Sequence, residues 1–298
     1  MLYRIRLCID YRFARATGAG RQQFRILPAA LPGVQTVAAE SVSITPEPLE
    51  TLEFTDFFGT RVIEAAMPPG LTSVKVEMRA EVIRHTSAAE FDISASLADL
   101  PEEIALIRDV GREAPHHFLP PSPRLPRVAE ITAFAAGVID PQGTTRQAVQ
   151  ALGEALHEAM TFDAEATEVD TPIAQAFAGR HGVCQDFAQI MIAGLRAHGI
   201  PAAYVAGYLR THPPPGKPRL EGADAMHAWV RAWCGAETGW LDYDPTNSCF
   251  VAEDHIVVGH GRDYGDVAPV IGMLRLDGAQ EGSHSVDIRP EGDDETAE

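Results

Sequence analysis

The sequence contains little of what marks several classes of protein. Only four cysteines occur, at positions 8, 184, 234 and 249, and no two of them form a CxxC pair. A small secreted domain held by disulfides normally has denser cysteines, so we expect reduced thiols and a cytoplasmic location. No apolar run reaches the roughly 20 residues that span a bilayer. The charged N-terminus also does not resemble a signal peptide.

Basic residues are scarce relative to acidic ones, with 24 lysines and arginines against 42 aspartates and glutamates, for a net charge of −18. This balance disfavours nucleic acid and anionic membranes as partners. A peptide or protein substrate is compatible with it, and the oligomeric state is not indicated. No EF-hand calcium loop and no cofactor motif occurs, so we expect neither calcium dependence nor a cofactor.

At 298 residues the chain is long enough for two domains. Apolar and polar residues alternate over residues 3–13, and similar short segments follow at 34–46, 51–67 and 71–85, separated by glycine and proline turns. This pattern predicts an antiparallel β-sandwich over residues 1–95.

A proline-rich passage at 115–126 lies in a predicted connecting segment, residues 96–126. Helical periodicity at 127–139 and 144–160 opens a second domain, which we place at 127–276. Residues 277–298 are rich in acids and poor in apolar residues, so we expect a disordered tail.

The stretch from Arg180 to Asn247 holds a possible thiol site. Cys184 begins a predicted helix that ends at Gly199, His227 lies on a predicted strand, and Asp244 precedes a Pro turn. Backbone N–H groups at a helix start favour a thiolate. A thiol nucleophile needs a base, and the base needs a third group that fixes its tautomer. This trio supplies all three.

Each residue also has a structural interpretation. Cys184 could be an inert core thiol, His227 a hydrogen-bonded core histidine and Asp244 a turn former. A zinc site from Cys184, His227, Cys234 and Cys249 is conceivable, but it lacks the short paired spacing of structural zinc sites, so we expect no metal.

The segments GVCQDFA, HAWV and DPTN, in this order, resemble the core of the transglutaminase-like superfamily of papain-related thiol enzymes. The resemblance extends to residues 162–177 and 261–272, and FTDFFGTRV resembles the N-terminal domain of the bacterial branch, although Asp10 replaces a residue that is often basic there. It implies an α+β fold: a papain-like core, with a cysteine helix packed on an antiparallel sheet, preceded by the sandwich.

The resemblance also implies roles in catalysis. Cys184 would be the nucleophile, His227 its base and Asp244 the group that orients the histidine, with Asp242 as the second choice for that last role. In the segment 261–272 we expect a buried Arg262–Asp263 pair that pins the loop, with substrate contact as the alternative.

Attack on an amide carbonyl also needs an oxyanion hole. The Cys184 backbone N–H is the first donor that we expect, and Gln185 and His181 are candidates for the second. Trp229 and Trp240 are candidate apolar walls against substrate, with packing in the core as the equal alternative. The loop 211–225 is a candidate rim or lid, with an ordinary surface connection as its alternative.

Three functions remain open. A cysteine peptidase or amidase is favoured, because many bacterial members of the superfamily are regarded as cysteine proteases. A protein-glutamine gamma-glutamyltransferase is the second hypothesis, and a non-catalytic binding module is the third.

Overall fold

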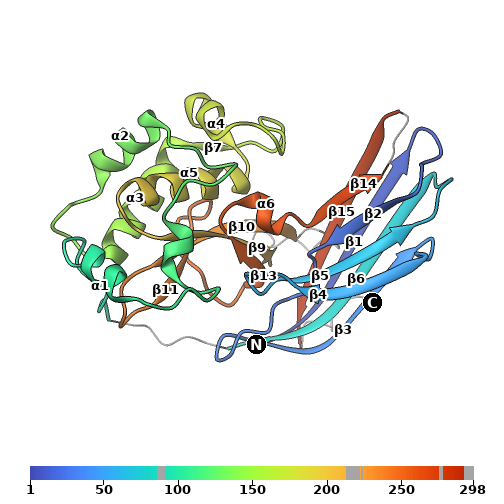
Figure 1. Cartoon of the computed structure of the whole chain (residues 1–298), viewed down its shortest axis with the longest axis horizontal. Helices are drawn as coiled ribbons and strands as arrows, with labels where there is room; N and C mark the ends of the chain where they lie inside the picture. The colour runs from blue at the N-terminus through green and yellow to red at the C-terminus, as the bar shows by residue number, and fades with distance from the viewer. Residues whose placement is uncertain (86–90, 213–221, 223, 275–277, 292–298) are drawn as a thin grey trace.

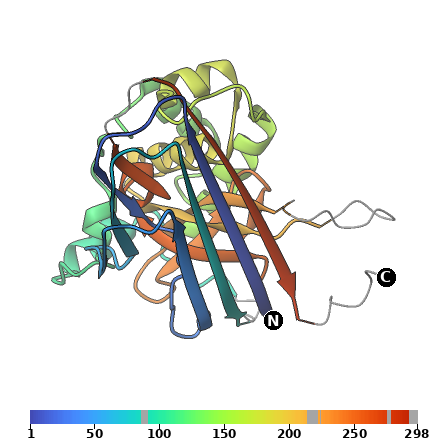
Figure 2. The same cartoon turned by 90° about the vertical axis from the view of Figure 1, so that its right-hand side faces the viewer.

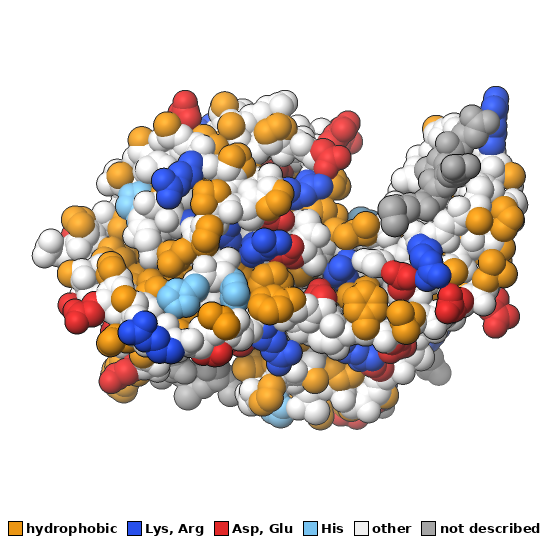
Figure 3. Space-filling model, viewed as in Figure 1, with side chains coloured by type: hydrophobic (Ala, Val, Ile, Leu, Met, Phe, Trp, Pro, Cys, Tyr) orange, Lys and Arg blue, Asp and Glu red, His pale blue; other side chains and the backbone are white. Residues whose placement is uncertain are grey.

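The computed structural model describes the chain except for residues 86–90, 213–221, 223, 275–277 and 292–298. Two bodies stand side by side, a helix-rich one and a sandwich of long strands (Figure 1). The space-filling view shows a hollow between their upper parts (Figure 3). No helix in the described part of the chain has the length and apolar character needed to cross a bilayer.

The sandwich consists of two four-stranded antiparallel sheets, in the orders β15-β1-β6-β3 and β14-β2-β5-β4. The N-terminal segment supplies β1 (Leu2–Phe13), β2 (Gly20–Phe24), β3 (Gln35–Thr45), β4 (Glu50–Thr55), β5 (Arg61–Met67) and β6 (Ser73–Arg84).

The alternation along β1 follows the prediction. Tyr3, Ile5, Leu7 and Ile9 are all buried in the core between the sheets, whereas Tyr11 is partly exposed. Successive residues of a strand point to opposite faces, so one face of β1 enters this core.

The last two strands return the chain to the first domain. They are β14 (Val270–Leu274) and β15 (Gln280–Pro290). β15 pairs with β1 in antiparallel register, from Gln280 opposite Phe13 to Pro290 opposite Tyr3. Figure 2 shows it in red beside β1 in dark blue.

The prediction of a disordered tail is therefore wrong for residues 280–290, and the sandwich extends beyond the predicted 1–95. The physical reason is that Val286 and Ile288, although few, alternate and are both buried in the sandwich core. Residues 277 and 292–298 lie outside the described part of the chain.

The second body is an α+β domain, with a five-stranded antiparallel sheet in the order β12-β11-β10-β9-β13. Its strands are β9 (Ala202–Leu209), β10 (Ala225–Trp233), β11 (Trp240–Asp244), β12 (Cys249–Phe250) and β13 (His255–Gly261). Its helices are α1 (Leu100–Leu106), α2 (Ala129–Val138), α3 (Thr145–Ala159), α4 (Ile173–Gly179), α5 (Cys184–Ala197) and α6 (Tyr264–Val267), with a short 3-10 turn at Pro115–Phe118 and a two-stranded parallel pair, β7 (Thr161–Phe162) and β8 (His181–Gly182).

Helix α5 is the centre of this domain. Its apolar residues, among them Ile190 and Leu195, share one core with Ala228 and Val230 of β10 and with Leu152 of α3. The expected packing of a cysteine helix on an antiparallel sheet is confirmed. Leu100, Ile104 and Leu125 of the predicted connecting segment join the same core, so that segment is part of this domain.

Candidate active site

Cys184 is the first residue of α5. The preceding Val183 is extended, and its backbone N–H donates to the Asp186 carboxylate at 2.9 Å. This bond fixes the entry of the chain into the helix. The Cys184 side chain is partly exposed and therefore accessible. Among the described residues, no acceptor is assigned to the backbone N–H of Cys184 or of Gln185, so both are available to an oxyanion.

The loop before α4 is tied to this helix start. Thr167 donates to Asp186 at 2.6 Å, and the Gln185 side chain donates to the Val169 carbonyl at 3.0 Å. Burial raises the pKa of Asp186, although the hydrogen bonds from Thr167 and from the Val183 backbone oppose the shift. A Cβ atom added at Gly182 would lie 2.6 Å from the Asp186 Oδ2 atom, so the close approach at this position requires glycine.

His227 lies near the start of β10, opposite Gly207 of β9, and is 8% exposed. Its Nε2 atom donates to Asp244 Oδ2 at 2.7 Å. Burial lowers the pKa of His227, but the hydrogen bond to Asp244 and the contact with the Cys184 thiol outweigh burial and raise the pKa to about 10. At neutral pH the ring is therefore an imidazolium.

Asp244 is the last residue of β11 and is fully buried. Its Oδ1 atom accepts hydrogen bonds from the backbone N–H groups of Thr246 and Asn247, and its Oδ2 atom accepts from the side chains of His227, Asn247 and His255. Burial alone would raise the pKa of Asp244, but these donors hold it far below its ordinary value. The carboxylate is therefore charged and fixed in orientation.

Asp242, the second choice for orienting His227, lies elsewhere in this network. Its carboxylate accepts a hydrogen bond from the Trp229 indole at 2.9 Å and lies 3.6 Å from the Arg231 guanidinium. Of the two aspartates, Asp244 is the one that the structure brings to His227.

Two of the candidate substrate residues, Trp229 and Trp240, do not lie where a substrate wall would be expected. Trp229 has no exposed surface and packs with Val205 and Val257, so it cannot wall a substrate site in this structure. Trp240 begins β11, four residues from Asp244, which places it roughly 13 Å along the strand. Its ring packs against Phe118.

His181 is exposed, three residues before Cys184. It lines a cavity of about 350 Å³ with Asp163, Thr167, Thr171 and Gln175. The Gln185 side chain is 8% exposed and already donates to the loop. Within the loop 211–225, the predicted rim, residues 213–221 and 223 lie outside the described part of the chain.

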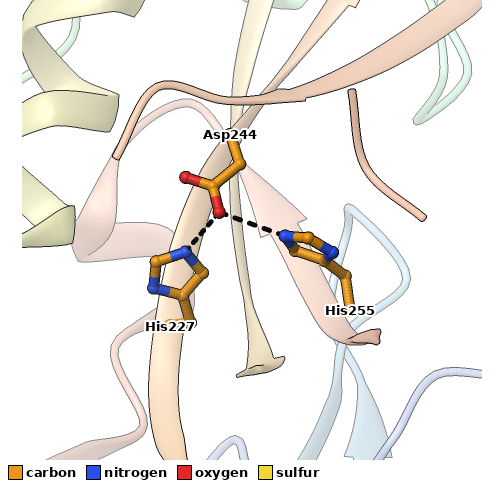
Figure 4. A group of neighbouring side chains, drawn as sticks. All are labelled: His227, Asp244 and His255. Atoms are coloured by element: carbon orange, nitrogen blue, oxygen red, sulfur yellow. Dashed lines mark hydrogen bonds and ion pairs between the residues drawn. The ribbon is translucent and has the colours of Figure 1, made fainter. Parts of the chain in front are cut away.

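Sequence reasoning missed two partners of Asp244, namely Asn247 and His255. Asn247 lies in the DPTN segment, so that motif could have pointed to it. His255 comes from β13, and Figure 4 shows its ring on the opposite side of the carboxylate from His227. No local pattern distinguishes His255 from an ordinary buried strand residue.

One group in the described part of the chain has metal-binding side chains close together: the ligand atoms of His227, Asp244 and His255 lie within 4.8 Å of one another. Hydrogen bonds already join both imidazoles to the carboxylate. The four residues considered for zinc are not brought together: Cys234 is fully buried, and its thiol donates to the Ala232 carbonyl.

The prediction of a buried pair between Arg262 and Asp263 is wrong. Arg262 pairs instead with Asp266 at 2.9 Å on the surface. Asp263 is buried and accepts hydrogen bonds from the backbone N–H groups of Gly265 and Arg124, because the carboxylate caps the short helix α6.

The sequence matches two families. Residues 132–245 match the transglutaminase-like superfamily, and residues 3–83 match the bacterial transglutaminase-like N-terminal region. A solved structure of a candidate cysteine protease from Cytophaga hutchinsonii is similar over 99% of this chain and 92% of that chain, with a TM-score of 0.75 and 21% identity. This likeness shows the fold.

Curated relatives match parts of the chain. An uncharacterized protein of Mycobacterium tuberculosis is 42% identical over 147 residues, which are 48% of this chain and 47% of the relative. An uncharacterized protein of Mycobacterium leprae is 50% identical over 102 residues, 33% of this chain and 34% of the relative. A protein-glutamine gamma-glutamyltransferase of Pseudomonas aeruginosa is 42% identical over 89 residues, 30% of this chain and 13% of the relative. Each match covers less than half of the relative's length.

Proposed function

Because this chain belongs to the transglutaminase-like superfamily, we propose that it is a thiol enzyme that cleaves amide bonds of peptide or isopeptide substrates through a thioester on Cys184. The observation that carries the proposal is the position of His227, which contacts the Cys184 thiol and donates to the buried Asp244 carboxylate. Each of these side chains has a separate structural explanation. Their meeting in one place is what a nucleophile, a base and an orienting group require.

In the first half of the reaction, the Cys184 thiolate attacks the substrate carbonyl carbon. The backbone N–H groups of Cys184 and Gln185 stabilise the oxyanion that forms, since neither has a backbone acceptor assigned in the described part of the chain. The imidazolium of His227 gives its proton to the leaving amine, and the thioester remains on Cys184.

In the second half, the neutral His227 ring takes a proton from the incoming nucleophile. Water then releases a carboxylic acid, whereas a primary amine gives a new amide. In both cases Cys184 leaves as a thiolate and His227 again carries the proton. Asp244 holds the His227 Nε2–H throughout, so that Nδ1 is the atom that exchanges protons.

We favour hydrolysis over transfer. An efficient transferase must shield its thioester from water with apolar walls, and Trp229 lies inside the protein rather than beside the substrate. The surface around His181 is lined by polar side chains, including Asp163 and Thr167. A peptidase or amidase, unlike a transferase, does not need apolar walls that exclude water.

Gamma-glutamyl transfer is the second candidate. The named Pseudomonas aeruginosa transferase shares 42% identity with this chain over 89 residues. A non-catalytic binding module is less consistent with a partly exposed cysteine in contact with a charged histidine.

The experiment that separates these candidates mixes the enzyme with glutamine-containing peptides and an excess of a fluorescent primary amine. We expect released acid or cleaved peptide to exceed amine incorporation, and Cys184→Ser to abolish both. Predominant amine incorporation would establish a transferase. A wild-type enzyme that gives neither product with any peptide in a broad library would support the binding module.

We also propose a cytoplasmic location. All four cysteines are free thiols, as is usual for proteins of a reducing compartment. Cell fractionation should find the protein with cytoplasmic markers, and recovery with exported proteins would contradict this.

A further inference from the structure

The Asp244 carboxylate serves two imidazoles. His227 donates to its Oδ2 atom at 2.7 Å, and His255 donates to the same atom at 3.1 Å (Figure 4). Only the first of these rings contacts the nucleophile. The second has no place in the reaction described above, although it is 4% exposed and lies deep in the site.

The surroundings of His255 determine its tautomer. Its Nε2 atom must carry the proton, because the charged carboxylate only accepts hydrogen bonds. Its Nδ1 atom is buried and has no partner in the described part of the chain. A second proton there would be a buried donor without an acceptor, which is costly. His255 therefore donates to Asp244 through Nε2, with its ring held edge-on against the Trp229 ring at a centroid distance of 5.3 Å.

The strand that carries His255 is held by the N-terminal sandwich. The Gln35 side chain, 1% exposed, donates to the Val257 carbonyl at 2.8 Å and accepts from the Val257 N–H at 2.9 Å. Ile256 and Val258, on the other face of the strand, belong to the sandwich core. The segment just before the strand is also held, because Tyr3 donates to Asp254 at 3.2 Å and Arg84 to the Ala252 carbonyl at 3.2 Å.

We infer that His255 is a positioning residue through which the N-terminal sandwich fixes the Asp244 carboxylate, and thereby His227, in the orientation that the reaction needs. The inference rests on the proposed function and adds a role for the first domain. Gln35 and the sandwich core place β13, β13 places His255, and His255 closes the side of the carboxylate that His227 leaves open. The titratable groups that face this network are Cys184 of α5, His227 of β10, His255 of β13, Cys249 of β12, and Tyr243 and Asp244 of β11.

The test compares two replacements of His255. His255→Gln keeps an N–H donor at about the reach of Nε2, whereas His255→Phe keeps a ring without a donor. We expect His255→Phe to lower kcat about 10- to 100-fold with KM within about twofold, by analogy with the outer partners of metal-bound histidines. His255→Gln should recover most of this loss. His260→Phe is the matched control, because His260 is buried on the same strand and has no contact with Asp244.

A second readout needs no substrate, so it separates this inference from the proposed function. The imidazole Cε1–H signal of His227, followed by NMR across pH, should titrate at a lower pH in His255→Phe and close to wild type in His255→Gln and His260→Phe. A midpoint that is unmoved or raised in His255→Phe would overturn the inference. Equal behaviour of the Phe and Gln variants would do the same. If His255→Phe does not fold, His255→Asn replaces it, because its amide is too short to reach Asp244.

The sandwich's part is tested with Gln35→Met, which keeps the side-chain length and removes the bonds to Val257. Gln22→Met is its control, since Gln22 is a buried glutamine of β2 outside the contacts with β13. We expect Gln35→Met to shift the His227 titration in the same direction as His255→Phe, by a smaller amount. Equal titrations in the Gln35 and Gln22 variants would show that the sandwich does not act on the site.

Discussion

Replacement of Asp244 by asparagine should nearly abolish turnover without unfolding the protein. All five donors that surround the carboxylate point at oxygen atoms, three at Oδ2 and two at Oδ1. An asparagine has one oxygen, so its NH₂ group must face donors at one of the two positions. With no water-exposed surface on this side chain, solvent cannot relieve the conflict.

The consequence reaches Cys184 through the His227 ring. If the amide NH₂ takes the Oδ2 position, the His227 Nε2 atom must become an acceptor and the proton moves to Nδ1. A ring in that tautomer cannot take a proton from the thiol. The same substitution in serine-enzyme triads costs about ten-thousandfold in turnover, which is about 5.4 kcal/mol in activation free energy.

The assay is peptide-amide hydrolysis by purified variants, with thermal unfolding to verify the fold. Asp242→Asn is the matched control, because this neighbour lies two residues away on the same strand and its retained oxygen can still accept from Trp229. A folded Asp244→Asn enzyme with more than a tenth of wild-type turnover would refute the reasoning. So would a larger loss in Asp242→Asn.

Three further predictions follow from the site. Cys184 should be the thiol that iodoacetamide alkylates fastest in the native protein, because burial raises the pKa of Cys234 to about 12 and also raises the pKa of Cys249. Peptide mapping that finds another cysteine labelled first would contradict this. Gly182→Ala should slow that labelling at least about tenfold, since the new Cβ would displace Asp186 and the start of α5, and unchanged labelling would show that the contact is tolerated. The raised pKa of His227 contributes stability that is fully present below about pH 6.5 and is lost as pH rises through about 10. The free energies of urea unfolding of wild type and His227→Gln should therefore differ most near pH 6. A difference that does not change with pH would contradict the charge assignment.

Much of the fold could be predicted because it follows local patterns. The alternation of β1 arises from one face that must be buried, α5 has its large apolar residues at helical spacing although nearly all of the helix is buried, and both elements form where the sequence indicates. The start of α5 at Cys184 was also predicted from the sequence, and the helix begins at this residue. Composition was a poorer guide, because β15 needs only Val286 and Ile288 at alternate positions to hold a mostly polar strand in the sandwich.

The candidate site was less predictable where its contacts are distant in sequence. The meeting of Asp244 with His227 was expected from the family resemblance, whereas the contact of Asp244 with His255 depends on where β13 lies between β9 and the sandwich core. For Trp229, the sequence left a substrate wall and core packing as equal alternatives, and the structure shows core packing. Its position two residues after His227 suggested the wall. The Trp229 side chain instead packs into a core with Val205 and Val257, where Gly207 leaves room for the indole.

The most direct test of the account is the detection of the thioester itself. The enzyme is mixed with a peptide-amide substrate, quenched in acid within the first turnover, and mapped by mass spectrometry. The account predicts an acyl group on Cys184 that disappears as free acid accumulates, and no adduct or product in Cys184→Ser. Amide cleavage that proceeds without an adduct on Cys184, or that survives in Cys184→Ser, would contradict it.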